Sequence, residues 1–600
     1  MKTIKTMTAL VLVLALAPSA AIAMQSKTVV TSANQLPVYS YQLPAAPSAL
    51  LEGPIAPVMA LAEQLLRDDA KTLAAYEITD LSTREEMLGR RLVVATLKRD
   101  LATVKATAVE LRAIQQREDR KLTAGLVGEI IAESCAAKDP TATVNALVPA
   151  RLGALPWAQV DSWMKQTRAG FSTANPGLII GTFKQQLDPV VAKNGNKVDM
   201  GTASSIVATR MALQCRLPVA AAMDAALGTI ISKQAAAAPA VDIWKDRDVV
   251  LTNAMPGKPV TIAIWDSGVD MSLFKAAANP GVAVSWDGKV TRDPLLRAAG
   301  PYQKDTQRLM DLVKGSMDLQ AGQQTAEATA FQTYMRGIKP EQAKEVGESL
   351  GFVGNYIHGT HVAGIATAGN PFARVKAIAN YWPYRQEDFR LDRAGAEGRA
   401  KFYRDIVTQM KRDGVRVVNM SWRVSPAAFD GMLQLQGGHP DAEARKKLAQ
   451  ELYAIEKTAM DAAIKSAPNI LFVAGAGNEA NDSNFADYMP AGLTAPNLLT
   501  VGAVDRAGRE ALFTSIGGTV AVYANGVEVE SFFPGGQRRA LSGTSMASPQ
   551  VAGIAAKLVA LKPTLSAAQL RDLLVSTADQ RGRTKLVNAK AAFAKAGVVL

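Results

Sequence analysis

Cysteine and histidine are scarce in this chain. Among 600 residues there are only two cysteines and three histidines. Two cysteines exclude a disulfide-dense scaffold and a four-cysteine zinc site. Three histidines argue against a multi-histidine metal centre. Beyond the N-terminal segment, no run reaches the roughly 18 unbroken apolar residues of a membrane-spanning helix. We therefore expect no membrane span.

The composition is that of a folded protein. Hydrophobic residues make up 48% of the chain and charged residues 20%, which predicts sizeable cores and excludes a mainly disordered or collagen-like chain. The length allows about two to four domains. Lys and Arg exceed Asp and Glu by 67 to 54, a net charge of +13. Because this excess is spread over many residues, we expect a solvated surface and no nucleic-acid partner.

The first 23 residues have the features of a secretory signal peptide. Lys2 and Lys5 charge the start, an apolar run covers 9–17, and Ala21-Ile22-Ala23 is a small-x-small cleavage site. No cysteine lies near that site, so no lipid anchor is expected there. The segment predicts export of a bacterial type, to the periplasm or beyond.

Export would place both cysteines in an oxidising compartment. Cys135 and Cys215 could then form a disulfide, which would stabilise the fold by up to about 4 kcal/mol in the chain-entropy model. The alternative is two buried free thiols.

The N-terminal part of the chain changes character along its length. Residues 24–56 are rich in Pro, Ser and Ala, which predicts a flexible leader. Over 57–233, leucines recur near helical spacing between charged residues, which predicts an all-helical N-terminal domain. The Asp80–Thr83 segment predicts the start of one of its helices. A linker is expected over 234–245.

From residue 246 onward the pattern becomes that of a parallel α/β sheet. Short apolar runs alternate with helical patterns, which is typical of that arrangement. The expected strands are Val260–Trp265, Val415–Met420, Ile470–Ala474 and Leu498–Val504. The expected helices cover 396–412, 442–466, 546–561 and 566–577. Functional residues of such sheets gather at the carboxyl ends of the strands.

Four segments of this part carry chemistry. Asp266 ends a strand, and His358 begins the small-residue string HGTHVAGIA. Asn478 follows a buried strand and a glycine turn, and Ser545 opens a long apolar helix within GTSMASP.

These residue types suit nucleophilic catalysis. A serine hydroxyl needs a base beside it, and the imidazole of His358 can take and return its proton. The carboxylate of Asp266 would fix the imidazole tautomer. The side chain of Asn478 and the backbone N–H of Ser545 are candidate donors to an oxyanion.

The four strings, in this order, closely resemble the subtilisin-like serine peptidases, or subtilases, over about 259–597. The resemblance implies a subtilisin-like parallel sheet flanked by helices, in a domain covering 246–600. It implies Asp266, His358 and Ser545 as a catalytic triad and Asn478 as the oxyanion-hole residue. It implies protein or peptide substrates and no required cofactor; calcium sites are common in the family, but no ligands can be placed. The substrate strand would pair along Ser421, Trp422, Arg423, Gly475, Ala476 and Gly477.

Three features depart from the family pattern. The long connection from Asp266 to His358 predicts an insertion near 292–350, which either walls the cleft or is a neutral surface excursion. Arg423 stands where the family usually has glycine; it would narrow the cleft, recruit an acidic substrate group, or point to solvent. The region 57–233 shows no match to the family's small propeptide, so it is either a removable pro-region or a permanent domain.

The function expected from these residues is that of a secreted serine endopeptidase acting through an acyl-enzyme. A narrow-specificity processing peptidase or a transpeptidase would use the same triad. A catalytically silent binding protein is the non-enzymatic alternative. The sequence does not indicate the natural substrate or the oligomeric state.

Overall fold

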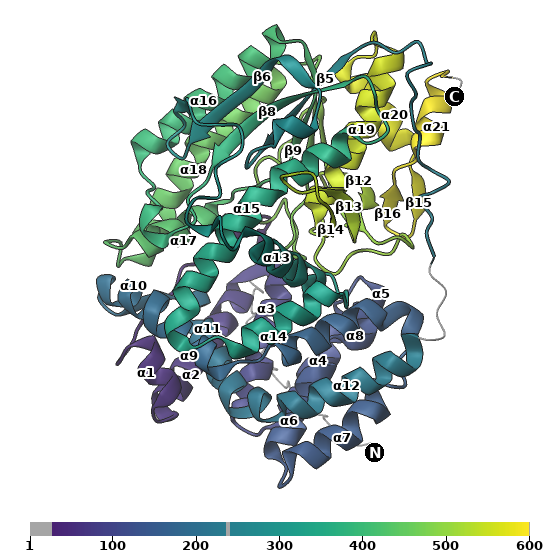
Figure 1. The fold of residues 1–600 in the computed structure, drawn as a ribbon. Coiled ribbons are helices and arrows are strands. Elements are labelled where there is room, and N and C mark those ends of the chain that lie inside the picture. Colours follow the sequence, from purple (N-terminus) through teal and green to yellow (C-terminus); the bar gives the residue numbers. More distant parts are fainter. Residues whose placement is uncertain (1–26, 236–240, 599–600) are drawn as a thin grey trace, which may run out of the picture.

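The computed structural model describes residues 27–235 and 241–598, so the expected signal peptide and the centre of the expected linker lie outside the described residues. Figure 1 shows a helical region, residues 27–235, stacked against a sheet domain, residues 241–598. Helices α13, α14 and α15 lie between the two.

Most of the helical region consists of helices, and four short strands accompany them. In chain order its elements are β1 (Thr28–Val30), β2 (Ser40–Gln42), α1 (Pro47–Glu52), α2 (Ala56–Ala75), β3 (Tyr76–Ile78), α3 (Leu81–Leu97), α4 (Leu101–Ala113), α5 (Glu118–Thr123), α6 (Leu126–Ala136), α7 (Pro140–Arg151), α8 (Trp157–Ser172), α9 (Pro176–Thr182), α10 (Asp188–Lys193), β4 (Lys197–Asp199), α11 (Met200–Met211) and α12 (Ala220–Ala235). The predicted helix start at Asp80 is present, because its carboxylate caps α3 by accepting from the backbone N–H of Thr83 at 2.7 Å. Cys135 and Cys215 form a disulfide.

The prediction of a flexible leader over 24–56 was wrong for its described part. Strand β1 pairs with β3, and β2 pairs with β4. The segment also inserts apolar side chains into the core of the helical region: Tyr41, Leu43, Leu50 and Leu51 are each less than 5% exposed. The high content of Pro and Ser had indicated a flexible segment. The few apolar residues among them are buried, and this burial stabilises the segment.

One helical stretch among the described residues, Met200–Gln234, is long and apolar enough to cross a membrane by length and composition alone. It runs from α11 to α12 and contains Cys215 of the disulfide. Within this fold α12 packs against α7 and α8 in a shared apolar cluster.

The sheet domain is built on a ten-stranded, mainly parallel sheet in the described chain, with the order β15-β16-β12-β11-β10-β9-β5-β8-β6-β7. Its strands are β5 (Val260–Asp266), β6 (Ala276–Ser285), β7 (Val290–Thr291), β8 (Ala373–Tyr381), β9 (Val415–Met420), β10 (Leu471–Gly475), β11 (Leu498–Val504), β12 (Val520–Asn525), β15 (Asp579–Arg581) and β16 (Thr584–Leu586). A separate hairpin pairs β13 (Val529–Phe532) with β14 (Arg538–Leu541). The helices are α13 (Thr306–Gln320), α14 (Ala326–Gly337), α15 (Ala343–Thr367), α16 (Arg393–Arg412), α17 (Pro426–Gln436), α18 (Ala442–Lys465), α19 (Thr544–Leu561), α20 (Ala567–Ser576) and α21 (Ala589–Lys595).

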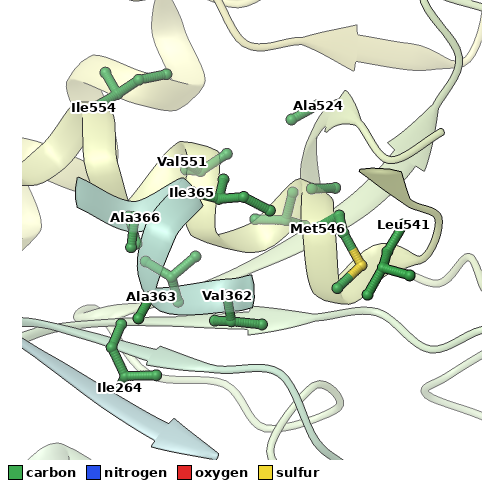
Figure 2. Close-up of a cluster of buried hydrophobic side chains, with 14 of the residues drawn as sticks. Ile264, Val362, Ala363, Ile365, Ala366, Ala524, Leu541, Met546, Val551 and Ile554 are labelled. Carbon is green, nitrogen blue, oxygen red and sulfur yellow. The ribbon is translucent and has the colours of Figure 1, made fainter. Parts of the chain in front are cut away.

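Helices cover both faces of this sheet. Side chains alternate along a strand, so Ile262 and Ile264 of β5 join the cluster under α15 and α19, while Ala263 and Trp265 join the cluster under α16 and α18. Figure 2 shows the first cluster, in which Ile264 lies beside Ala363 of α15, and Val551 and Ile554 of α19 contribute further side chains. The two helices approach closely at Gly553, where an added Cβ would stand 2.9 Å from the carbonyl oxygen of Ala366. This approach brings the N-terminus of α19 near α15.

The insertion expected near 292–350 contains two helices, α13 and α14. Its last residues form the first turns of α15, the helix that carries His358. Helix α13 packs on α15 and on α8 of the helical region. The insertion therefore bridges the two parts of the molecule, and the neutral surface excursion is not supported.

Candidate active site

Three of the predicted site residues lie at the ends of neighbouring strands, at one edge of the sheet. Asp266 ends β5, Ser421 follows β9, and Gly475 ends β10. The register pairs Trp265 with Met420 across β5 and β9. The carboxyl ends of these parallel strands therefore meet, as expected for a site at this edge.

Asp266 is fully buried and hydrogen-bonded on one oxygen. Its Oδ1 accepts from the backbone N–H of Ser267 at 2.7 Å. It also accepts from Nδ1 of His358 at 2.6 Å. Its Oδ2 is buried without a hydrogen-bond partner among the described residues. The backbone N–H of Ser267 and Nδ1 of His358 thus hold this carboxylate oxygen in place at the end of β5.

The side chain of His358 projects from the middle of α15 toward this carboxylate. Because Nδ1 donates to Asp266, Nε2 is the nitrogen left to accept a proton from a neighbouring group. Burial alone would lower the pKa of His358, but the charge and the hydrogen bond of Asp266 outweigh it and raise the pKa above 6.5.

Ser545 lies in the first turn of α19, directly after Gly543 and Thr544. Its Oγ donates to the carbonyl oxygen of Ser421 at 3.3 Å. The described structure shows no hydrogen bond between Ser545 and His358. Asp266 and His358 are thus hydrogen-bonded to each other. Ser545 is instead hydrogen-bonded to Ser421, the residue that follows the neighbouring strand β9.

Asn478 is oriented by Thr544. Its Oδ1 accepts from the backbone N–H of Thr544 at 2.9 Å and from the Thr544 hydroxyl at 3.0 Å. Both bonds engage the oxygen, so the amide nitrogen Nδ2 remains as a donor. Thr544 was not singled out by the sequence analysis, although it stands inside the GTSMASP string.

The glycine turn before Asn478 is tied into the sheet domain. Ala476 donates its N–H to Val501 at 2.9 Å, and Gly477 donates to the Thr544 hydroxyl at 3.2 Å. Gly477 adopts φ +117°, which disfavours a side chain there. The stretch 475–477 is therefore rigidly held beside Asn478.

On the other predicted binding stretch, Trp422 and Arg423 have distinct surroundings. Trp422 packs against Trp265 and Tyr403, with ring centroids at 5.6 and 6.4 Å. Arg423 forms an ion pair with Glu479 and lies 5.6 Å from the centre of the Tyr488 ring. About a third of its side chain (34%) is exposed. Arg423 does not simply point to solvent, and its charge already has a carboxylate partner.

Sequence reasoning missed both partners of Arg423. Glu479 directly follows Asn478, and this adjacency was the available signal. Tyr488 comes from a distant loop, and no local pattern indicates it.

The second histidine of the HGTH string has a structural contact. His361 is fully buried, and its Nε2 donates to the carbonyl oxygen of Arg539 at 3.0 Å. Burial lowers the pKa of His361 to about 3, so it stays neutral. This contact ties α15 to strand β14.

No group of three or more His, Cys, Asp or Glu side chains able to hold a metal occurs in the described ranges. In the Asn481–Asn484 segment, Oδ1 of Asp482 accepts from the backbone N–H groups of Asn484 and Phe485, which is a turn. Calcium ligands therefore remain unplaced.

Comparisons with known proteins agree with this arrangement. The chain is 34% identical to subtilisin DY of Bacillus licheniformis over 242 residues, which is 39% of this chain and 75% of that protein. It is 41% identical to a subtilisin of Bacillus pumilus over 142 residues, which is 23% of this chain and 50% of that protein.

Solved structures similar to this chain include a cold-adapted subtilisin-like serine proteinase, at 19% identity and a TM-score of 0.34. That match covers 58% of this chain and 99% of the other. The model of the subtilase family matches residues 257–592, more than half of the chain. The chain therefore belongs to the subtilase family of serine-type peptidases.

Proposed function

We propose that this protein is a secreted serine endopeptidase that uses Asp266, His358 and Ser545 as its triad. The 2.6 Å hydrogen bond between His358 and the buried Asp266 carries the proposal. It fixes the imidazole with Nε2 free, at the sheet edge where Ser545 and Asn478 also lie. An imidazole held in one tautomer by a buried carboxylate is the general base that a serine nucleophile requires.

The reaction would proceed through an acyl-enzyme. Ser545 Oγ turns from the Ser421 carbonyl to a second staggered position and gives its proton to His358 Nε2 as it attacks the substrate carbonyl carbon. His358 then gives that proton to the leaving amine as the C–N bond breaks. Water attacks the resulting ester in the same way and releases the acid. Asp266 holds the imidazole in place throughout and stabilises the imidazolium that forms.

Two donors would stabilise the oxyanion in this reaction. The first is Nδ2 of Asn478, whose oxygen is occupied by Thr544. The second is the backbone N–H of Ser545 in the first turn of α19, where a helix has no internal acceptor for its donors. Both are held in place before the charge develops, which is the main condition for this kind of stabilisation.

The ion pair between Arg423 and Glu479 favours narrow specificity. It joins Arg423, at the end of the stretch 421–423, to the residue that follows Asn478. The side chain before the cleaved bond would bind beside the stretches 421–423 and 475–477. We propose that the ion pair restricts this pocket to small side chains. An acidic substrate group would have to compete with Glu479 for Arg423, so recruitment of acidic groups is disfavoured. A narrow-specificity processing peptidase is thus the second candidate function.

Export is supported by the signal-like segment 1–23 and by the disulfide between Cys135 and Cys215. We propose that the linker near 230–250 is cut after export, by this enzyme or by another. Mass spectrometry of secreted wild-type protein beside Ser545→Ala distinguishes these routes. A cut absent from Ser545→Ala indicates self-processing, and a cut present in both indicates another protease.

Hydrolysis of an unfolded protein tests the proposed function. Wild-type full-length protein should cut it, and the new N-termini define the cleavage preference. Ser545→Ala should leave the substrate intact while keeping the circular dichroism of the wild type. If both proteins cut equally, the proposed nucleophile is wrong. If neither does, labelling of Ser545 with a fluorophosphonate separates the two remaining accounts, because a narrow-specificity peptidase would be labelled and a silent binding protein would not.

A further inference from the structure

The helical region lies close to Asn478 but forms no hydrogen bond with it in the described structure. A cavity of about 530 Å³ separates the helical region from the sheet domain here, and Arg117, Asn478 and Phe513 all line it. Any influence of the helical region on Asn478 must therefore be carried by the segments around this cavity.

Arg117 of the helical region binds the sheet domain directly. It lies just before α5, outside the part of the chain that the family model matches. Its Nη1 donates to the carbonyl oxygen of Ala511 at 3.0 Å. Longer contacts, at 3.4 and 3.5 Å, reach the carbonyl oxygens of Glu510 and Leu512. One guanidinium thus holds three successive carbonyl groups, and a charged donor forms stronger hydrogen bonds than a neutral one.

The guanidinium of Arg117 is itself held in one orientation. Asp119 accepts from its Nε at 3.0 Å and from its Nη2 at 2.9 Å. Two parallel bonds of this kind fix the plane of the guanidinium. Only 15% of the Arg117 side chain is exposed, so water competes little for these contacts.

Strand β11 holds the same segment of the sheet domain from its other side. Ala511 donates its N–H to the carbonyl oxygen of Ala503 at 3.1 Å. The hydroxyl of Thr514 accepts from the N–H of Ala503 at 2.9 Å. The segment 510–516 is therefore fixed between β11 and Arg117, which binds carbonyl groups that β11 does not bind in the described structure.

The continuation of this segment holds the backbone on both sides of Asn478. The carbonyl oxygen of Phe513 accepts from the N–H of Ala480 at 2.9 Å. Ser515 is fully buried and donates its N–H to the carbonyl oxygen of Gly477 at 2.9 Å. A displacement of the segment would therefore move the backbone that carries the Asn478 side chain.

A second contact from the helical region reaches the loop that follows Asn478. The N–H of Ala33 donates to the carbonyl oxygen of Phe485 at 3.0 Å. The N–H of Phe485 donates in turn to Oδ1 of Asp482 at 3.1 Å, within the same loop. The helical region therefore binds this loop directly as well as through Arg117.

We propose that Arg117 is a positioning residue that holds Asn478 in place as an oxyanion donor, through the segment 510–516. Thr544 orients the amide group of Asn478, and Arg117 fixes the backbone that carries it. This inference rests on the proposed peptidase function. It gives the helical region a part in catalysis that continues after the linker has been cut.

Replacing Arg117 tests the proposal on the full-length protein. Arg117→Met removes the donors and keeps an unbranched side chain. A donor to the oxyanion acts mainly in the transition state, so kcat should fall about tenfold while KM stays within about twofold. Arg117→Lys keeps a charged donor without the planar fork, and its kcat should fall about threefold. Should Arg117→Met fail to fold, Arg117→Lys carries the same test. Steady-state kinetics on an internally quenched peptide with the preferred cleavage site measure both.

Asn175→Ser is the matched control. Nδ2 of Asn175 in the helical region donates to the carbonyl oxygens of Met335, Arg336 and Ile338 at 2.9, 3.3 and 2.9 Å. The change removes three contacts of the same kind at the end of α14, and serine can still cap α9. Its kcat should stay within about twofold of wild type. An equal loss of kcat in Arg117→Met and Asn175→Ser would overturn the proposal.

A double-mutant cycle separates positioning of Asn478 from a general structural role. If Arg117 acts through Asn478, then Arg117→Met should lower kcat by less than about twofold when Asn478→Leu is already present. Losses of kcat that simply multiply would show that Arg117 acts elsewhere, and they would overturn the proposal.

Hydrogen exchange provides a measurement that needs no activity. It is followed by mass spectrometry with Ser545→Ala present, which prevents self-digestion. Arg117→Met should speed exchange about tenfold in the peptide covering 477–482, because the N–H of Ala480 loses a fixed acceptor. Asn175→Ser should leave this peptide unchanged.

Unchanged exchange over 477–482 in Arg117→Met would contradict the role given to Arg117. Failure of the proposed function is distinguishable, because wild type would then hydrolyse no substrate. The exchange measurement would still decide whether Arg117 holds the loop of Asn478.

Discussion

Gly359 of α15 lies directly against the carbonyl oxygen of Gly268, in the turn that follows β5. A Cβ at residue 359 would stand 2.2 Å from that oxygen, closer than any side chain can approach. The absence of a side chain lets α15 approach the end of β5 closely enough for His358 to bond Asp266. The hydroxyl of Ser267 reinforces the approach by donating to the carbonyl oxygen of Asn355 at 2.6 Å.

Gly359→Ala should therefore lower the catalytic activity strongly and change the folded structure little. The added methyl group pushes α15 away from the turn and lengthens the bond between His358 and Asp266. Because small misplacements of catalytic groups are costly, we expect kcat/KM to fall by about 10²-fold. Steady-state kinetics and circular dichroism measure both effects.

Gly354→Ala is the matched control for this change. It lies on the same helix, and an added Cβ there meets nothing within 4 Å. Alanine is the better helix former, so the variant should keep its activity and be slightly more stable. Equal losses in Gly354→Ala and Gly359→Ala would refute the role given to Gly359.

The pH dependence of activity should report the imidazole of His358. The base must be neutral, so kcat/KM should fall as the pH drops through an apparent pKa above 6.5. Asp266→Asn removes the charge that raises this pKa, so its acidic limb should move to lower pH. The loss of orientation should also reduce kcat by about 10⁴-fold, as for the corresponding change in another serine peptidase. An acidic limb that does not move would contradict the pairing.

Asn478→Leu tests the oxyanion donor. Removal of one such donor costs about 10² to 10³ in kcat in subtilisin, the family's type enzyme, so a similar loss with little change in KM is expected here. Thr544→Val removes the hydroxyl that orients Asn478 but keeps the backbone N–H, and its loss should be smaller. An unaltered kcat in Asn478→Leu would mean that the donor lies elsewhere.

Arg423→Gly tests the pocket. Without the guanidinium, the contacts with Glu479 and Tyr488 are lost, so cleavage should broaden toward aromatic side chains before the cleaved bond. Arg423→Lys keeps the charge without the planar fork and should change the preference less. A peptide-library profile measures this, and an identical profile for Arg423→Gly would remove this residue from the specificity account.

Much of the sheet could be predicted from apolar runs bounded by turns. The expected strands Val415–Met420 and Leu498–Val504 have the observed bounds of β9 and β11. Strand β8 was not predicted, because Lys376 interrupts its apolar pattern. This lysine is fully buried and bonds Asp413 at 2.8 Å, a contact that only the fold brings together.

Some residues of the site could also be predicted from the sequence, and others could not. Asp266 and His358 were predicted from strings that encode local geometry, and the structure joins them. The partners of Arg423 could not be predicted together, since Glu479 and Tyr488 reach it only through the packing of separate loops. The cavity beside Asn478 forms where the helical region packs against the sheet domain, and no local sequence pattern predicts that packing.

Labelling with a fluorophosphonate tests the central claim most directly. The reagent reacts with a serine only where a base activates it and an oxyanion hole stabilises the adduct. The account predicts one adduct on the full-length protein, located by mass spectrometry on the peptide that contains Ser545, and none in Ser545→Ala or His358→Ala. An adduct on another serine, or equal labelling of Ser545 in His358→Ala, would contradict it.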